Sequence, residues 1–189
     1  MNLLAHAVLS PANEKLLLGN VLADFIGRKE VESLDYEIQF GIVLHRRIDQ
    51  FTDSHPVVNR SKERLIGFQR YGNALVDVFF DHFLTKHWTH NLSVRSFTDD
   101  LYQSILAHND LLPETCRLIA HRMMQQDWLN HYSTTEGLTT NLSRMEFRIQ
   151  SRTGRTVDLV SSVKILEAEY ENFERDFLEF WPELVGHTS

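Results

Sequence analysis

The chain has 189 residues, 42% of them hydrophobic and 24% charged, a composition typical of a folded domain and unlike that of a disordered segment. Its net charge of -7 disfavours nucleic acid as a partner, because affinity for phosphate backbones comes from positive charge. The single cysteine, Cys116, excludes an internal disulfide and a cysteine-rich zinc site. No basic leader or long apolar stretch is present, so we expect a cytoplasmic protein without a membrane partner.

Helices are the expected secondary structure, because apolar residues recur at three- and four-residue intervals and few glycines and prolines interrupt them. Polar residues such as Asn13, Asp35 and Ser93 stand where helices should begin. In chain order, we expect helices over about residues 13–26, 36–53, 56–70, 73–90, 93–109, 114–131, 135–150 and 156–182. No linker or repeat separates them. The sequence therefore predicts one all-α domain over residues 1–189, with about seven to eight helices.

The first of these helices carries polar residues where apolar ones are expected. Residues 16–26 are almost wholly apolar, yet Asn20 and Asp24 lie one turn apart and share a helix face. A buried carboxylate without a partner costs several kcal/mol. We therefore expect Asp24 to pair with a cation, to be protonated, or to bind a metal, and an ordinary buried ion pair remains an alternative.

The second helix shows the same pattern more strongly. His45, Asp49 and Asp53 stand at intervals of four and form a polar stripe, in which an imidazole and a carboxylate can ligate one cation. Arg46 and Arg47 point elsewhere and are suited to holding a phosphate. For any one of these groups, a structural salt bridge is the simpler interpretation.

The fourth helix places Asp81 and His82 within a run of aromatic residues, and His6 lies in the apolar opening of the chain. A separate structural explanation for each intrusion is less economical than one shared metal site. Carboxylates and imidazoles without thiolates suit Mn, Mg, Fe, Co or Zn. Because a metal with an open position activates water and polarises phosphoryl oxygens, phosphoester hydrolysis is the expected reaction class.

The motifs together resemble the acyl-carrier-protein phosphodiesterase family. They are Met-Asn-Leu-Leu-Ala-His at residues 1–6, Gly-Asn-Val-Leu-Ala-Asp-Phe at 19–25, His-Arg-Arg-Ile-Asp at 45–49 with Thr52-Asp53, and Asp-His-Phe-Leu at 81–84. The resemblance implies an enzyme that removes 4'-phosphopantetheine from the serine of holo-acyl carrier protein and leaves the apo form. It also implies Mn2+ and an architecture like that of the HD-domain phosphohydrolases, although the adjacent pair here is Asp81-His82 and not His-Asp.

The resemblance also implies roles for individual residues. Asp24 is expected to be an essential carboxylate of the site, and His45 and Asp81 are the next expected metal ligands. Further members of the site are His6, Asp49 and His82, with Arg46 or Arg47 on the phosphate.

Two other functions remain open. One is an HD-type phosphohydrolase acting on a nucleotide, and the other is a non-catalytic helical binding module in which the polar residues form ion pairs.

If the partner is an acyl carrier protein, which is acidic, docking on a chain of charge -7 needs a local basic surface. The candidate cations are Arg28, Lys29, Arg46, Arg47, Arg60, Lys62, Arg64, Arg144, Arg148, Arg152 and Arg155. Surface salt bridges are an alternative use of the last four.

Overall fold

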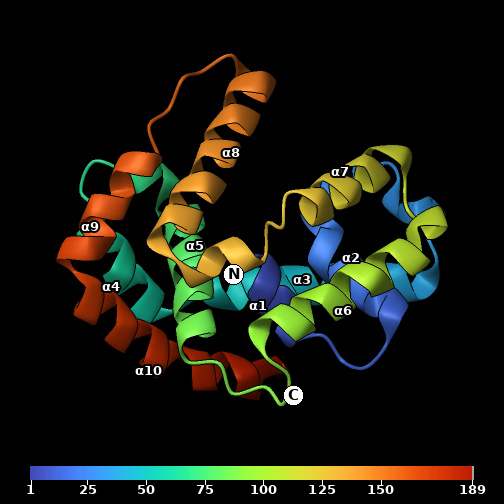
Figure 1. The fold of residues 1–189 in the computed structure, drawn as a ribbon, viewed down its shortest axis with the longest axis horizontal. Helices are drawn as coiled ribbons and strands as arrows, with labels where there is room; N and C mark the ends of the chain where they lie inside the picture. Colours follow the sequence, from blue (N-terminus) through green and yellow to red (C-terminus); the bar gives the residue numbers. More distant parts are fainter. Residues whose placement is uncertain (189) are drawn as a thin grey trace. The chain divides into compact units, whose positions relative to one another are not determined.

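The computed structural model describes residues 1–188, and the all-α prediction is confirmed: this part of the chain contains ten α-helices and no strand (Figure 1). The helices are α1 (Leu3–Val8), α2 (Glu14–Leu22), α3 (Tyr36–Ser54), α4 (Pro56–Arg64), α5 (Gly72–Lys86), α6 (Val94–Ala107), α7 (Glu114–Gln125), α8 (Thr135–Thr153), α9 (Val163–Ala168) and α10 (Tyr170–Thr188). Six 3-10 turns join them: η1 (Ala23–Phe25), η2 (Val31–Ser33), η3 (Gln69–Tyr71), η4 (Asn109–Leu111), η5 (Asn130–Ser133) and η6 (Val160–Ser162).

The helix count exceeds the expected seven to eight because of the two ends of the chain. The helix α1 has only six residues, too few for a periodic pattern to predict it. The helix expected over 156–182 is divided at Glu169 into α9 and α10. Helix starts agree better with the sequence: the side chains of Asn13 and Ser93 accept hydrogen bonds from the amides of Leu16 and Ser96.

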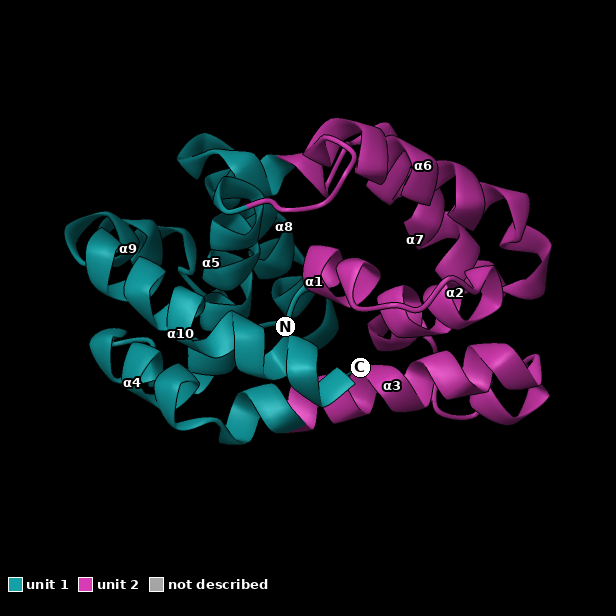
Figure 2. Ribbon diagram, turned by 90° about the horizontal axis from the view of Figure 1, so that it is seen from below, with its two compact units in different colours: residues 1–2, 51–87, 131–189 teal, residues 3–50, 88–130 magenta. Residues whose placement is uncertain are grey.

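Two compact units divide the chain, and each is assembled from separated segments (Figure 2). Unit 1 contains residues 1–2, 51–87 and those from 131 onward, and unit 2 contains residues 3–50 and 88–130. Because neither unit is continuous in sequence, no linker composition could have indicated them. The single domain over residues 1–189 stays a prediction.

In unit 1, the helices α4, α5 and α10 pack on one another around phenylalanine side chains. Phe79 meets Phe173 edge-on with ring centroids 5.4 Å apart, and Phe80 meets Phe177 at 5.7 Å. Aromatic residues thus fill the interior of this unit, as the apolar girth of α5 predicts.

In unit 2, the backbones of α2 and α3 touch at two glycines. A Cβ atom on Gly19 would lie 2.0 Å from the carbonyl oxygen of Ile38, and one on Gly41 would lie 2.1 Å from that of Leu16. No other residue fits at either position. This close contact between α2 and α3 sets how the two helices align. It therefore positions the residues of α3 one turn after Gly41, where the candidate site begins.

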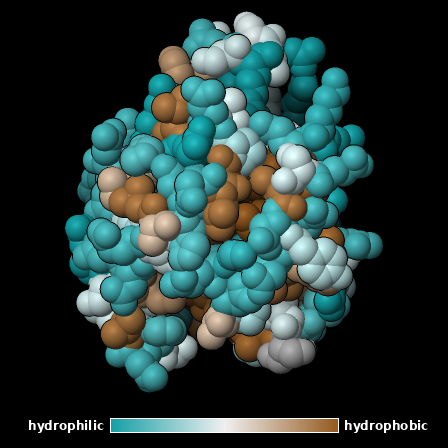
Figure 3. Space-filling model, turned by 90° about the vertical axis from the view of Figure 1, so that its right-hand side faces the viewer, coloured by the Kyte–Doolittle hydropathy of each residue, from teal (hydrophilic) through white to brown (hydrophobic). Residues whose placement is uncertain are grey.

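The surface retains apolar side chains. Figure 3 shows hydrophobic residues, in brown, among hydrophilic ones on the right-hand side of Figure 1, where α7 lies. In unit 2, the exposed large apolar residues include Tyr36, Phe40, Val43, Leu92 and Leu118. None of the described helices is long and apolar enough to cross a membrane. The cytoplasmic location stays a prediction.

Candidate metal centre

The candidate site begins on α3, where Gly41, His45 and Asp49 recur every four residues on one face. Since Gly41 makes the close approach to α2, the next turn brings the His45 ring beneath the backbone of Asn20. His45 Nδ1 lies 2.7 Å from the carbonyl oxygen of Asn20. A carbonyl can only accept, so Nδ1 carries the proton and the Nε2 atom of the neutral ring holds a lone pair.

The side chain of Asn20 orients a second imidazole, that of His6. Its amide nitrogen donates to the His6 carbonyl at 2.8 Å and to the Ser10 hydroxyl at 2.9 Å, which leaves Asn20 Oδ1 as the acceptor. His6 Nδ1 donates to that oxygen at 3.0 Å. The His6 ring therefore has the same tautomer as His45, and the two rings stack with centroids 4.0 Å apart.

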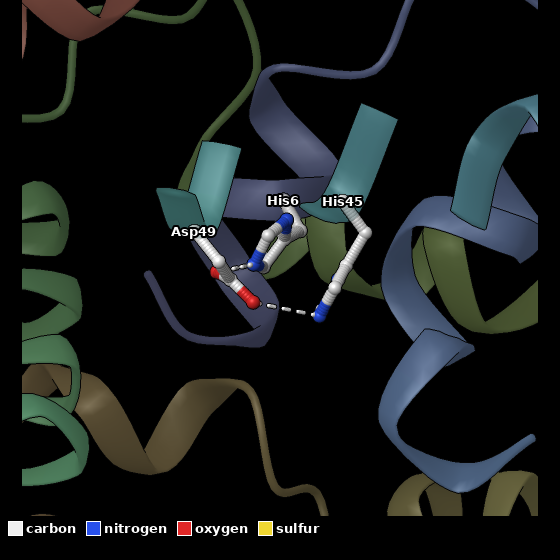
Figure 4. A group of neighbouring side chains, drawn as sticks. All are labelled: His6, His45 and Asp49. Carbon is white, nitrogen blue, oxygen red and sulfur yellow. Dashed lines mark ion pairs between the residues drawn. The ribbon is translucent and has the colours of Figure 1, made fainter. Parts of the chain in front are cut away.

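Both Nε2 atoms point toward the carboxylate of Asp49 (Figure 4). His6 Nε2 lies 3.2 Å from Asp49 Oδ1, and His45 Nε2 lies 3.1 Å from Asp49 Oδ2. One atom from each of the three residues lies within 4.8 Å of the others. Asp24 approaches from η1, with its Oδ1 3.5 Å from His45 Nε2.

This geometry fits a divalent metal ion. His45 Nε2 is buried, yet it makes no hydrogen bond with any of residues 1–188, although two carboxylates are near. A cation placed among the two Nε2 atoms and the carboxylate would be attracted by all three groups. Imidazole and carboxylate ligands without thiolates suit Mn, Fe, Co and Zn.

The protonation equilibria of the group also indicate a cation site. Burial lowers the pKa of His6 to about 4, so this ring is neutral. Burial acts in the same direction on His45, but the carboxylates of Asp24 and Asp49 outweigh it and raise the pKa of His45 to about 9. Burial likewise opposes ionisation of Asp49, yet His45 and His6 hold its pKa well below the usual range. A proton on His45 therefore balances the carboxylates when no metal is bound.

The expected burial of Asp24 is wrong. The helix α2 ends at Leu22, and the following turn η1 leaves the Asp24 side chain 71% exposed. Asp24 belongs to the site because its carboxylate lies beside His45 Nε2, although its side chain is exposed. The neighbouring imidazole lowers the pKa of Asp24, against the effect of desolvation.

Asp81 and His82 belong to unit 1 and are not members of the three-residue group. Both ring nitrogens of His82 have partners in that unit: Nδ1 lies 2.8 Å from the Tyr132 carbonyl oxygen, and Nε2 lies 2.8 Å from the Tyr170 hydroxyl. The His82 ring therefore has no nitrogen left for a metal. Asp81 is fully buried on the same helix, and nothing in the geometry of the group supports its assignment as a ligand.

The two arginines after His45 separate around the helix. Successive residues are about 100° apart, so Arg47 lies about 200° from His45, on the opposite side of α3. Arg46 lies between and lines a pocket of about 430 Å³ together with Arg28, Val31 and Glu32. Nothing in the local sequence around Val31 and Glu32 indicated a site.

Several of the expected docking cations have partners inside unit 1. Arg60 and Arg64 both bind the buried carboxylate of Asp176, and Lys62 donates to the Asp53 carbonyl. On α8, Arg144 donates to His131 and Asn141. The helix ends at Thr153, and Gly154 adopts a left-handed conformation, so Arg155 does not continue the expected face. Docking through Lys29, Arg148 and Arg152 stays a prediction.

Comparison with known proteins matches residues 1–184 to the family of acyl carrier protein phosphodiesterases. The chain belongs to this family. A relative with that name from Serratia proteamaculans is 31% identical, over 98% of this chain and 96% of its own length. Relatives of the same name from Pectobacterium atrosepticum and Escherichia coli are each 30% identical, over 98% and 100% of this chain and 96% and 98% of their own lengths. No solved structure matches the chain.

Proposed function

We propose that this member of the family is a metal-dependent phosphodiesterase, which hydrolyses the bond between 4'-phosphopantetheine and the serine of holo-acyl carrier protein. Water forms the new O–P bond, and the serine oxygen leaves with a proton, so the products are 4'-phosphopantetheine and the apo-carrier. The observation that carries the metal dependence is the group of His6, His45 and Asp49, whose ligand atoms converge while His45 Nε2 lacks a hydrogen bond among the described residues.

Each residue of the group has a part in this proposal. His6, His45 and Asp49 would hold the metal, for which we propose Mn2+, and such an ion lowers the pKa of water and polarises a phosphoryl oxygen. Asp24 is the exposed carboxylate of the site and is suited to accepting a proton from the attacking water. Asn20 holds both imidazoles in the tautomer that ligation requires.

Two alternatives make different predictions. A non-catalytic binding module would need no convergence of ligand atoms, whereas one atom each of His6, His45 and Asp49 lies within 4.8 Å of the others. A nucleotide phosphohydrolase would use the same metal group but would act on small substrates without a carrier protein. Substrate choice therefore separates the proposed function from this second alternative.

Intact-mass spectrometry of holo-acyl carrier protein tests the proposal directly. The full chain is stripped of metal with a chelator, checked by elemental analysis, and incubated with the carrier before and after addition of Mn2+. We expect loss of the whole prosthetic group only with Mn2+, and no loss with an Asp49→Asn variant. Full activity of the stripped protein would contradict metal dependence, and cleavage of nucleotides but not of the carrier would support the phosphohydrolase.

A further inference from the structure

A second feature of unit 2 is the pocket of about 430 Å³ lined by Arg28, Val31, Glu32 and Arg46. Its volume lies within the range of small-ligand sites, about 300–1,000 Å³. The residues come from the segment that follows η1, from η2 and from α3. Arg46 directly follows His45, and Arg28 stands four residues after Asp24. The helix α3 thus contributes both to this pocket and to the metal group of His6, His45 and Asp49.

The two arginines of this pocket are uncompensated. Neither Arg28 nor Arg46 has an ion pair or a side-chain hydrogen bond with any residue from 1 to 188, and Glu32 lies outside ion-pair distance of both. In unit 1, by contrast, Arg60 and Arg64 are both paired with Asp176. Two guanidinium groups that share a concave surface without a carboxylate partner repel each other, and a bound anion relieves that repulsion.

The charges also indicate what kind of anion fits. Two arginines and one glutamate give the pocket a net charge of +1, which matches a phosphodiester with one negative charge. A phosphate monoester carries about -1.5 to -2 at neutral pH. Glu32 therefore penalises a monoester, such as the phosphate group of the released product, more than it penalises the diester.

We propose that Arg28 and Arg46 form the subsite that binds the phosphate of the phosphodiester substrate, and that Glu32 makes this subsite selective for the singly charged diester. This inference rests on the proposed function for the identity of the substrate. The binding of a phosphate anion by the two arginines can be measured without turnover.

The first experiment compares single-charge variants of the full chain. Arg28→Gln and Arg46→Gln should each weaken the binding of inorganic phosphate, measured calorimetrically with Mn2+ present, by about tenfold or more. The control is Arg122→Gln, which removes an exposed arginine of α7 in the same unit and should change phosphate binding by less than about twofold. All three variants should bind Mn2+ like the wild type. Equal effects in the three variants would overturn the subsite, because they would show only a loss of general positive charge.

The second experiment tests selectivity with Glu32→Gln. This variant should bind inorganic phosphate more tightly than the wild type, while KM for holo-carrier protein falls by a smaller factor. Equal changes for both anions, or none, would contradict the role of Glu32. If the wild type fails to cleave holo-carrier protein but the arginine variants still lose phosphate binding, the proposed function fails and the anion subsite stands. If the wild type cleaves the carrier and the arginine variants retain full phosphate binding, only the subsite fails.

Discussion

His45 on α3 and His82 on α5 look alike in the sequence, because each lies in an apolar helix near a carboxylate. In the structure, His82 has a hydrogen-bond partner on both ring nitrogens, whereas the Nε2 atom of His45 has none among the described residues. Both histidines are buried, so burial alone does not distinguish a structural histidine from a metal ligand. The difference is whether a ring nitrogen is directed at other potential ligand atoms, as the Nε2 atom of His45 is.

The arginines of the two units differ in the same way. Arg60 and Arg64 in unit 1 are bound by the buried Asp176, which also accepts from the Ser61 hydroxyl at 2.8 Å. Arg28 and Arg46 in unit 2 share a pocket without an ion pair to any of residues 1–188. A count of cations in the sequence gives both pairs equal weight, and only the structure shows that one pair has a carboxylate partner while the other has none among residues 1–188.

The largest expected effect comes from His45→Ala. This change removes a ligand atom at the centre of the group, so we expect Mn2+ affinity and turnover to fall by more than the roughly 10- to 100-fold that loss of a supporting hydrogen bond causes. The matched variant His82→Ala removes the hydrogen bonds of the buried ring to Tyr132 and Tyr170 and should cost about 1–3 kcal/mol of stability without loss of metal. Elemental analysis and thermal unfolding measure both. Equal metal loss in the two variants would remove the distinction drawn between these histidines.

Asp176→Asn should have the next largest effect, on stability alone. The carboxylate is fully buried and joins Arg60, Ser61 and Arg64, so its neutralisation should lower the free energy of unfolding by about 3 kcal/mol. Glu179→Gln is the control, because this partner of Arg60 is about half exposed and should cost less than about 1 kcal/mol. Urea titration measures both, and metal content should not change. A loss of bound metal in Asp176→Asn would contradict a purely structural role.

Asn20→Ala should have a smaller effect, confined to one histidine. The side chain fixes the tautomer of His6, whereas the backbone carbonyl that holds His45 remains. We expect Mn2+ affinity to fall by about 10- to 100-fold. In 15N NMR spectra of the metal-free protein, the ring signals of His6 should change more than those of His45. Ser10→Ala is the control, because it removes a hydroxyl that accepts from the Asn20 amide and donates to the His6 carbonyl, but it keeps the bond between Asn20 Oδ1 and the His6 ring. Identical ring signals in Asn20→Ala and the wild type would rule out this positioning role.

The sequence predicted those parts of the site that depend on local periodicity. His45 and Asp49 share a face because they lie four residues apart on one helix, and His6 was a candidate because it interrupts an apolar segment. The exposure of Asp24 depends on where α2 ends, and the meeting of α2 and α3 depends on the contact between Gly19 and Gly41. Both are set by tertiary packing, which a local pattern does not contain. The partners of His82 lie 50 and 88 residues away in the chain and are equally invisible to it.

The smallest expected effect is the release of about one proton when the metal binds. In the metal-free protein the pKa of His45 is raised to about 9, so below that pH its Nε2 atom carries a proton that the metal must displace. The pKa of His6 is about 4, so His6 releases none at neutral pH. Mn2+ affinity should therefore rise about tenfold per pH unit and level off near pH 9.

Because the pKa of His45 is above its unfolded value, its contribution to stability is fully present below pH 6.5 and is lost as the pH rises through 9. That loss should appear in the metal-free protein and not in the Mn2+-loaded protein, since the bound ion replaces the proton. Calorimetric titration with Mn2+ in buffers of different ionisation enthalpy counts the protons, and a count near zero would show that the carboxylates do not hold a proton on His45.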